Sequence, residues 1–309
     1  MELSKPERIG QVSMDYRWYD GVDQYNDGDE VEELVLSICK EGKNVYPILQ
    51  NDSRWPVLYQ LSPGREVIIE PMNLMLTDHV LEIGAGMGAV TGAIARRVCH
   101  VDCVELSLRR AMANAWRHQE YENIRILVGN YHNMHLETRY NVVTLIGVLE
   151  YAGYYMHGVD NAPLKLLERV KSQMQIGGRL YIAIENRLGM KYFSGCCEDH
   201  LAYSFPGVEG YPARNGIQTF SKSELEELLI DAGFGDLYFY YPFPDYKFPS
   251  VIYAEDNISK DLTEFIPDVL NMDLHRIRTF DERRAQLSLT GTREFGVFAN
   301  SFLVEAVRL

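Results

Sequence analysis

Residues 79–92 constrain the fold of this chain more than any other stretch. They open with an apolar run of strand length, Val80 to Ile83. Three glycines follow at once with a spacing of two residues, and we expect a helix over 89–97 directly after them. Glycine adopts positive φ, and its missing Cβ lets another molecule approach the backbone. The stretch therefore predicts a buried strand, a tight turn and a helix whose free N–H groups face any ligand above the glycines.

The spacing of these glycines separates two classes of cofactor site. Dinucleotide enzymes carry G-x-G-x-x-G, whereas here the third glycine comes one residue earlier and Glu82 stands two places before the first. The pattern E-x-G-x-G-x-G resembles the first motif of class I S-adenosylmethionine-dependent methyltransferases, in which the glycine turn packs against the methionine part of the cofactor. The resemblance implies cofactor contacts for Glu82, Gly84, Ala85 and Gly86. The alternative is an ordinary strand-to-helix turn.

A second signal for a nucleoside cofactor follows about twenty residues after the glycines. Glu105 lies near the end of a strand predicted over 101–106, where a carboxylate can accept both hydroxyls of a ribose. Leu106 is its neighbour, and we include it in the cofactor site. Ser107 then caps a helix that we expect to run to about residue 118. The alternative for Glu105 is a solvated residue at a strand end.

The ends of the next two strands complete the predicted cofactor site. Strands are expected over 124–128 and 141–147, and ligands of open α/β sheets bind outside the carboxyl ends of strands. The methyltransferase family often has an Asp after the third strand that meets the adenine amino group. This chain has Asn130 there, and an amide can replace the carboxylate by accepting from N6 or donating to N1. Tyr131, Gly147 and Val148 are the other residues that we place at these strand ends.

Two residues are candidates for proton transfer. Glu150 follows the fourth strand beside Tyr151, Tyr154 and Tyr155, which offer an amphipathic wall for an acceptor. His200 lies in an aromatic and charged segment, residues 184–214, which we expect to be an ordered loop on the acceptor side. His200 is the first choice as general base because its ordinary pKa lies near neutral pH. The alternatives are a structural histidine and a glutamate that only shapes the pocket.

The N-terminal part of the chain offers one further candidate. Arg65 could pair with a ligand carboxylate, because a guanidinium matches that group with two hydrogen bonds; the alternative is a surface arginine. Aromatic and acidic residues over 14–29 could form a lid over a site or an arm packed on the core. The segment 30–40 has helical periodicity.

The order of the elements predicts an α/β fold with a Rossmann-like, doubly wound, seven-stranded sheet. Five strand–helix alternations are followed by a helix, a strand, an insertion and a final strand over 297–307. The resemblance implies that the last strand enters antiparallel between the fifth and the sixth. We expect an N-terminal helical arm over 1–76 and a class I methyltransferase domain over 77–309. Its acceptor-side insertions would be 186–219 and 244–295, the second with helices over 261–270 and 280–287.

Composition restricts the partners and the compartment. The chain has 309 residues and a net charge of −14 without a basic patch, which disfavours nucleic acid as a partner. No apolar run is long enough for a membrane span, and the first twenty residues contain no signal core. Five cysteines without a C-x-x-C pair suggest reduced thiols in the cytoplasm. Adjacent Cys196 and Cys197 are poorly placed for zinc, and we expect no metal site.

Several segments along the whole chain resemble a bacterial subgroup of class I methyltransferases associated with surface polysaccharide (lipopolysaccharide) biosynthesis. The segments are 61–65, 81–92, 147–151, 184–200, 241–247 and 298–302. The resemblance implies methyl transfer from S-adenosylmethionine to an oxygen nucleophile, with nitrogen as the alternative, on a small-molecule or glycan acceptor. For the oligomeric state, we consider a homodimer. The competing hypotheses are a non-catalytic binding module that uses the same site for a protein partner, and a dinucleotide-dependent oxidoreductase, which the glycine spacing disfavours.

Overall fold

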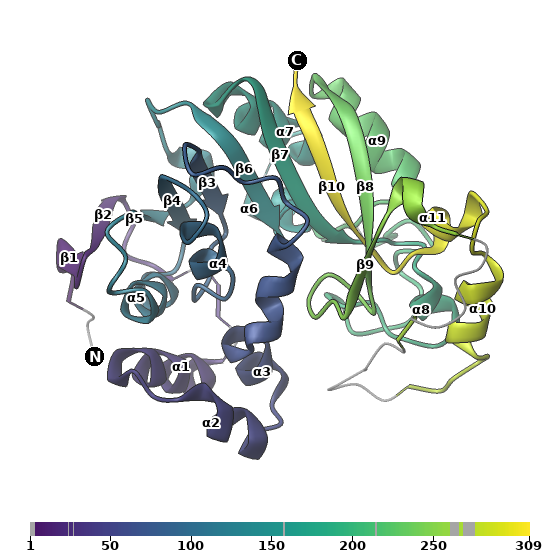
Figure 1. Cartoon of the computed structure of the whole chain (residues 1–309), viewed down its shortest axis with the longest axis horizontal. Coiled ribbons are helices and arrows are strands. Elements are labelled where there is room, and N and C mark those ends of the chain that lie inside the picture. The colour runs from purple at the N-terminus through teal and green to yellow at the C-terminus, as the bar shows by residue number, and fades with distance from the viewer. Residues whose placement is uncertain are drawn as a thin grey trace. The chain divides into compact units, whose positions relative to one another are not determined.

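The computed structural model describes residues 4–23, 25–26, 28–156, 158–213, 215–259, 266–267 and 276–309. The chain forms two compact units, each with its own strands and helices (Figure 1). The first comprises Met1–Thr144 with Gln173–Gly178, and the second comprises Leu145–Ser172 with Arg179–Leu309. Within the described residues, none of the helices is long and apolar enough to cross a bilayer.

The strands of the first unit lie in the order β1-β2-β5-β4-β3-β6. They are β1 (Arg8–Ile9), β2 (Val12–Trp18), β3 (His79–Ile83), β4 (His100–Glu105), β5 (Ile124–Gly129) and β6 (Tyr140–Ile146). Strand β4 pairs in parallel with β3 and β5, so the carboxyl ends of these strands lie at one edge. The apolar runs predicted as the first four strands of the sheet are confirmed as β3, β4, β5 and β6.

Strands β1 and β2 were not expected, because the N-terminal segment was predicted to be polar and then helical. Strand β2 adds to the sheet edge by parallel pairing with β5, and β1 pairs antiparallel with β2. The signal for β2 is a period of two, in which Val12 and Met14 are buried while Ser13 and Asp15 are less so. Aromatic and charged residues in the same segment obscured that alternation.

The helices of the first unit include two that the sequence predicts well. They are α1 (Asp29–Glu41), α2 (Val45–Asn51), α3 (Trp55–Leu61), η1 (Pro63–Ile69), α4 (Thr91–Ala95), α5 (Leu108–Arg117) and η2 (Tyr131–Asn133). Helix α1 ends at Gly42 in the left-handed conformation, and the Ser107 side chain caps α5 by accepting from the Arg110 N–H. Helix α4 is shorter than the predicted 89–97, because the non-helical backbone of Val90 delays its start.

The strands of the second unit lie in the order β7-β10-β8-β9. They are β7 (Met174–Glu185, of which Arg179–Glu185 belong to this unit), β8 (Phe234–Phe243), β9 (Val251–Ala254) and β10 (Ser301–Arg308). Strand β10 runs antiparallel between β7 and β8, as the methyltransferase resemblance implies (Figure 1). The seven-strand count is wrong for the described residues, which contain ten strands. The three additional strands lie at the edges: β1 and β2 follow beyond β5, and β9 lies beyond β8.

The helices of the second unit are mostly short. They are η3 (Leu149–Tyr151), α6 (Ala152–Tyr155), α7 (Ala162–Gln173), α8 (Met190–Phe193), α9 (Lys222–Asp231), η4 (Glu255–Asn257), α10 (Glu282–Ser288) and α11 (Glu294–Phe298). The capping box predicted at Ser221 is present at the start of α9. Helix α10 corresponds to the predicted helix 280–287. Apart from 266–267, which are not helical, the predicted helix 261–270 lies outside the described residues.

The segment that follows β7 is held to the end of the chain by side-chain hydrogen bonds. The Asn186 amide donates to the carbonyls of Val297 and Ala299, at 2.8 and 2.7 Å. The Asn300 side chain accepts from the Lys191 N–H at 2.9 Å. These hydrogen bonds fix the backbone of the segment against residues 297–300 and satisfy backbone groups there.

Candidate active site

In the first unit, the glycine turn joins β3 to α4 and is anchored to the neighbouring strand. The backbone N–H groups of Gly84 and Ala85 both donate to the Val104 carbonyl, at 2.9 and 3.0 Å. Gly86 and Gly88 have φ of +56° and +78°, a region that side chains with a Cβ rarely adopt. The two positions differ in what surrounds them.

A Cβ at Gly88 would lie 2.4 Å from Asn114 Oδ1, so the body of the protein already fills that side of the turn. A Cβ at Gly86 would meet nothing closer than the Arg110 guanidinium at 3.7 Å. Gly88 is therefore required for packing, whereas beside Gly86 the protein leaves room for a methyl group.

Glu105, at the end of β4, is tied to the glycine turn. Its Oε2 accepts from the Gly86 N–H at 2.8 Å, and its Oε1 accepts from the Ser107 N–H at 2.9 Å. The side chain is buried, and burial raises its pKa although the Arg110 guanidinium and the two N–H groups act in the opposite direction. Each carboxylate oxygen has a second lone pair. Glu105 therefore keeps acceptor capacity for hydroxyl groups while it positions the turn.

Glu82, in β3, links its own strand to the start of α4 and to β4 through side-chain hydrogen bonds. Its Oε2 accepts from the Thr91 hydroxyl at 2.8 Å, at the first residue of α4, and from the Cys103 thiol at 3.4 Å. Complete burial raises the pKa of Glu82 to about 7. These contacts favour a role in shaping the turn, and its predicted cofactor contact stays a prediction.

The remaining predicted residues of the first unit lie in different environments. Asn130 is the N-cap of η2, and its Oδ1 accepts from the His132 N–H at 2.9 Å. Arg65 is not a surface arginine: it is buried, its guanidinium lies 4.0 Å from the Tyr59 ring centroid, and it donates to the Tyr59 hydroxyl at 2.9 Å. Ala85 and Tyr131 are buried, and Leu106 is half-buried.

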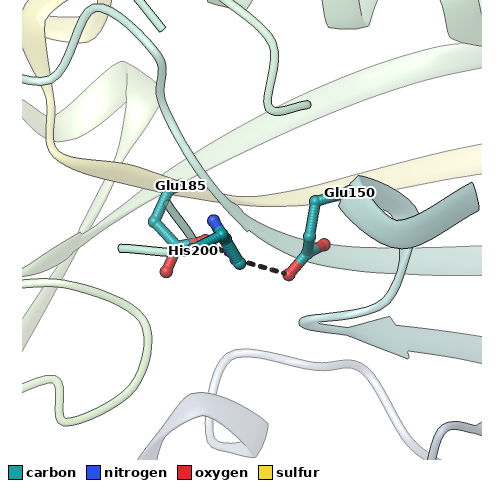
Figure 2. Close-up of side chains that lie close together, drawn as sticks. All are labelled: Glu150, Glu185 and His200. Carbon is teal, nitrogen blue, oxygen red and sulfur yellow. Dashed lines mark ion pairs between the residues drawn. The ribbon is translucent and has the colours of Figure 1, made fainter. Parts of the chain in front are cut away.

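In the second unit, Glu150 and His200 come together with a third residue, Glu185 (Figure 2). Glu150 lies in η3, Glu185 ends β7, and His200 lies in the segment after α8. His200 Nε2 lies 3.5 Å from Glu150 Oε1 and 3.8 Å from Glu185 Oε2. Glu150 is 1% exposed and Glu185 is fully buried. The segment predicted to carry a general base thus delivers His200 to the ends of two strands.

His200 is surrounded by carboxylates. Its Nδ1 lies 2.9 Å from Glu198 Oε1, and its backbone N–H donates to Glu198 Oε2 at 2.8 Å. Burial by itself would lower the pKa of His200, but Glu185, Glu150 and Glu198 together raise it well above its ordinary value. Burial raises the pKa of Glu150. The three carboxylates therefore favour a positive charge at the imidazole, either a proton or another cation.

Two buried lysines form ion pairs with Glu185 and Asp199, next to this cluster. Lys247 donates to Glu185 Oε1 and, at 2.9 Å, to Asp199 Oδ1. Lys191 Nζ lies 2.8 Å from Asp199 Oδ2. Glu185 was not among the predicted site residues, although an acid at the end of a buried apolar strand is the same signal that singled out Glu105.

Gly147 lies beside the same cluster. Its N–H donates to the Ala183 carbonyl at 2.9 Å, and its φ is +70°. A Cβ there would lie 2.8 Å from the Tyr246 hydroxyl and 3.6 Å from Glu150 Oε1. Val148 follows and starts the turn that delivers Glu150. The tight turn therefore brings Glu150 close to the strand end.

Comparison with known proteins identifies the domain. Residues 56–238, more than half of the chain, match a family model described as a methyltransferase domain. No curated protein sequence matches the chain.

Solved structures of methyltransferases are similar to this chain at low identity. One from Thermotoga maritima, a SAM-dependent methyltransferase, is 15% identical with a TM-score of 0.46, covering 90% of this chain and 100% of that one. Phosphoethanolamine N-methyltransferase 2 from Haemonchus contortus, with S-adenosyl-L-methionine, is 14% identical with a TM-score of 0.47, covering 79% and 52%. The glycopeptide N-methyltransferase MtfA, with S-adenosyl-L-methionine, is 15% identical with a TM-score of 0.44, covering 90% and 96%.

Proposed function

Because this chain belongs to the methyltransferase domain family, we propose that it transfers a methyl group from S-adenosylmethionine to an oxygen or nitrogen nucleophile. The observation that carries this proposal is the link between Glu105 and the glycine turn. The Gly86 N–H donates to the Glu105 carboxylate at 2.8 Å, and the space beside Gly86 is open. An acid and an unobstructed glycine backbone are thus held side by side, as a ribose and its attached methionine chain require.

The residues of the first unit would hold the cofactor. Glu105 would accept the ribose hydroxyls, and Gly84 and Gly86 would admit the methionine part. Asn130 would contact the adenine through its amide, with its Oδ1 already accepting from the η2 backbone. Arg65, which donates to the Tyr59 hydroxyl, would pair with the cofactor carboxylate.

S-adenosylmethionine supplies an electrophilic methyl carbon on a sulfonium when it is bound. The protein has to align the nucleophile in line with that carbon and to exclude water. A hydroxyl acceptor must also lose a proton. Glu150 and His200, whose Oε1 and Nε2 lie 3.5 Å apart, are the groups that would take it.

The acceptor class is a small molecule or a glycan. The net charge of −14 argues against nucleic acid, and the resemblance to the surface-polysaccharide subgroup favours a sugar hydroxyl. Tyr151 and Tyr154 fit that class, because aromatic rings provide an amphipathic wall. Tyr151 packs edge-on against His200, with ring centroids 5.3 Å apart. A cytoplasmic enzyme is consistent with five free cysteines.

Titration calorimetry of the full chain with S-adenosylmethionine and S-adenosylhomocysteine tests the cofactor, with NADH as the matched control. We expect both sulfur nucleosides to bind and NADH not to bind. Methyl-labelled cofactor is then screened with sugar nucleotides, glycans and small acids, and the products are read by mass. Absence of cofactor binding would refute the proposal. Binding without transfer to any acceptor would favour a non-catalytic module.

A further inference from the structure

The cluster of Glu150, Glu185 and His200 has the composition of a metal site. One ligand atom of each residue lies within 4.8 Å of the other two (Figure 2). Ligand atoms about 2.1 Å from an ion lie at most about 4.2 Å from one another. The distances from His200 Nε2 to the two carboxylates, 3.5 and 3.8 Å, already satisfy this limit.

The buried oxygens of the cluster lack hydrogen bonds. Among the described residues, neither oxygen of Glu150 has a hydrogen-bond partner, and the same holds for Glu185 Oε2. Both side chains are at least 99% buried. A buried carboxylate without hydrogen bonds is costly unless something else compensates its charge. One oxygen of each glutamate lies within 4.8 Å of the other and of His200 Nε2, so one cation could compensate both acids.

His200 and Glu185 each use their other polar side-chain atom to contact a residue outside the cluster. Glu198 contacts His200 Nδ1 at 2.9 Å, which leaves Nε2 for the cluster. Lys247 donates to Glu185 Oε1, which leaves Oε2 for the cluster. Metal-binding histidines usually have such a carboxylate on their second nitrogen, and metal-binding carboxylates are themselves hydrogen-bonded. In both His200 and Glu185, one side-chain atom is bound outside the cluster and the other faces it. A structural ion pair does not require this arrangement.

We propose that Glu150, Glu185 and His200 bind one divalent transition-metal ion. A set of two carboxylates and one imidazole suits Mn²⁺, Fe²⁺ or Zn²⁺ better than Ca²⁺, which prefers oxygen ligands alone. The ion takes the place of the proton on His200 Nε2. Three protein ligands leave coordination positions open, as in catalytic sites rather than in closed structural ones.

The use of this ion in catalysis rests on the proposed methyl transfer, whereas ion binding does not. An acceptor hydroxyl bound at an open position would lose its proton more readily, because a bound divalent ion lowers the pKa of a coordinated oxygen acid. Glu150, bound to the ion through one carboxylate oxygen, would take that proton on the other. The acceptor class therefore narrows to molecules with a hydroxyl that can coordinate the ion.

Manganese binding to the full chain tests the site after the protein has been dialysed against EDTA. Mn²⁺ is titrated by calorimetry and by electron paramagnetic resonance, and the thermal midpoint is followed with and without the ion. We expect one ion per chain and a higher midpoint with Mn²⁺. Glu185→Gln and His200→Ala should each weaken Mn²⁺ binding by tenfold or more and abolish the midpoint shift.

Matched controls are Glu209→Gln and His135→Ala, which change exposed residues away from the cluster. Both should bind Mn²⁺ like the unaltered chain. Glu150→Asp keeps the charge and serves as a variant that still folds, with weaker binding expected from its shorter side chain. Binding by the unaltered chain that is no tighter than by His200→Ala would overturn the metal site.

The two proposals fail separately. S-adenosylmethionine binding is measured in EDTA, where the ion is absent and the glycine turn is unaffected. Retained cofactor binding without Mn²⁺ binding would overturn only the metal site. Loss of cofactor binding with retained Mn²⁺ binding would overturn only the proposed function.

Discussion

The carboxylate of Glu105 accepts a hydrogen bond of 2.8 Å from the backbone N–H of Gly86. This bond joins the end of β4 to the turn after β3, and it fixes an acid next to an open glycine. The arrangement depends on the parallel pairing of β3 with β4, which brings two strand ends from different parts of the chain to one edge.

Glu105→Gln is expected to weaken S-adenosylmethionine binding by about 5- to 150-fold, the equivalent of about 1–3 kcal/mol for polar groups that lose a charged partner. The amide can accept only through its single oxygen, so one of the two N–H bonds or a ribose contact is lost. Calorimetry measures the effect, and Glu122→Gln, an exposed change, is the control. An unchanged dissociation constant would remove Glu105 from the ribose site.

Alanine substitutions should separate the two inner glycines of the turn. Gly88→Ala is expected to lower the thermal midpoint strongly, because its Cβ would lie 2.4 Å from Asn114 Oδ1. Gly86→Ala should cost only about 1–2 kcal/mol from its positive φ, but it should weaken cofactor binding by placing a methyl group in the open space. Thermal melts and calorimetry on both variants provide the comparison. Equal losses of stability would contradict it.

The stability of the chain should depend on pH through Glu82. Its folded pKa, about 7, lies above the ordinary value of 4.5, so the folded state holds a proton that the unfolded state has released. This contribution is fully present below pH 4.5 and is lost as the pH rises to about 7, by on the order of 3 kcal/mol.

Glu82→Gln keeps an acceptor for the Thr91 hydroxyl but does not titrate. Thermal midpoints of the variant and the unaltered chain are compared at pH 5, 6, 7 and 8. The variant should gain stability relative to the unaltered chain as the pH rises. A difference that stays constant over this range would show that Glu82 is ionised in the folded protein at all of these pH values.

Glu150→Gln should lower the turnover of an identified hydroxyl acceptor by about 10²- to 10⁴-fold, the range for loss of a proton acceptor. Cofactor affinity should stay the same, because Glu150 contacts His200 and not the glycine turn. Single-turnover methyl transfer and calorimetry are measured on the same preparation, with Glu209→Gln as the exposed control. Full turnover by Glu150→Gln would exclude a role in proton transfer.

Much of the fold could be predicted because its signals are local. The Ser107 cap of α5, the capping box of α9 and the apolar runs of β3 to β6 each depend on a few neighbouring residues. The edge strand β2 was missed because its alternation is mixed with aromatic and charged residues. The length of α4 was wrong because the backbone of the turn, and not helix propensity, decides where that helix starts.

Some residues of the candidate site could likewise be predicted from local sequence, and others could not. The glycine spacing and Glu105 could be recognised because a positive φ and a strand end are properties of a short stretch of chain. Two partners of His200 could not, since Glu150 lies in η3 and Glu185 at the end of β7, and a buried charge has no pattern of its own in a sequence.

By itself, the order of amino acids determined that this chain builds a strand, a glycine turn and a helix with the signature of an S-adenosylmethionine site. That information is contained in fourteen consecutive residues, 79–92, whose backbone preferences do not require the rest of the protein. Only the tertiary structure decided that His200 faces two buried glutamates, which raise its pKa. Electrostatic energies depend on distance and burial, and both are set by how remote segments pack.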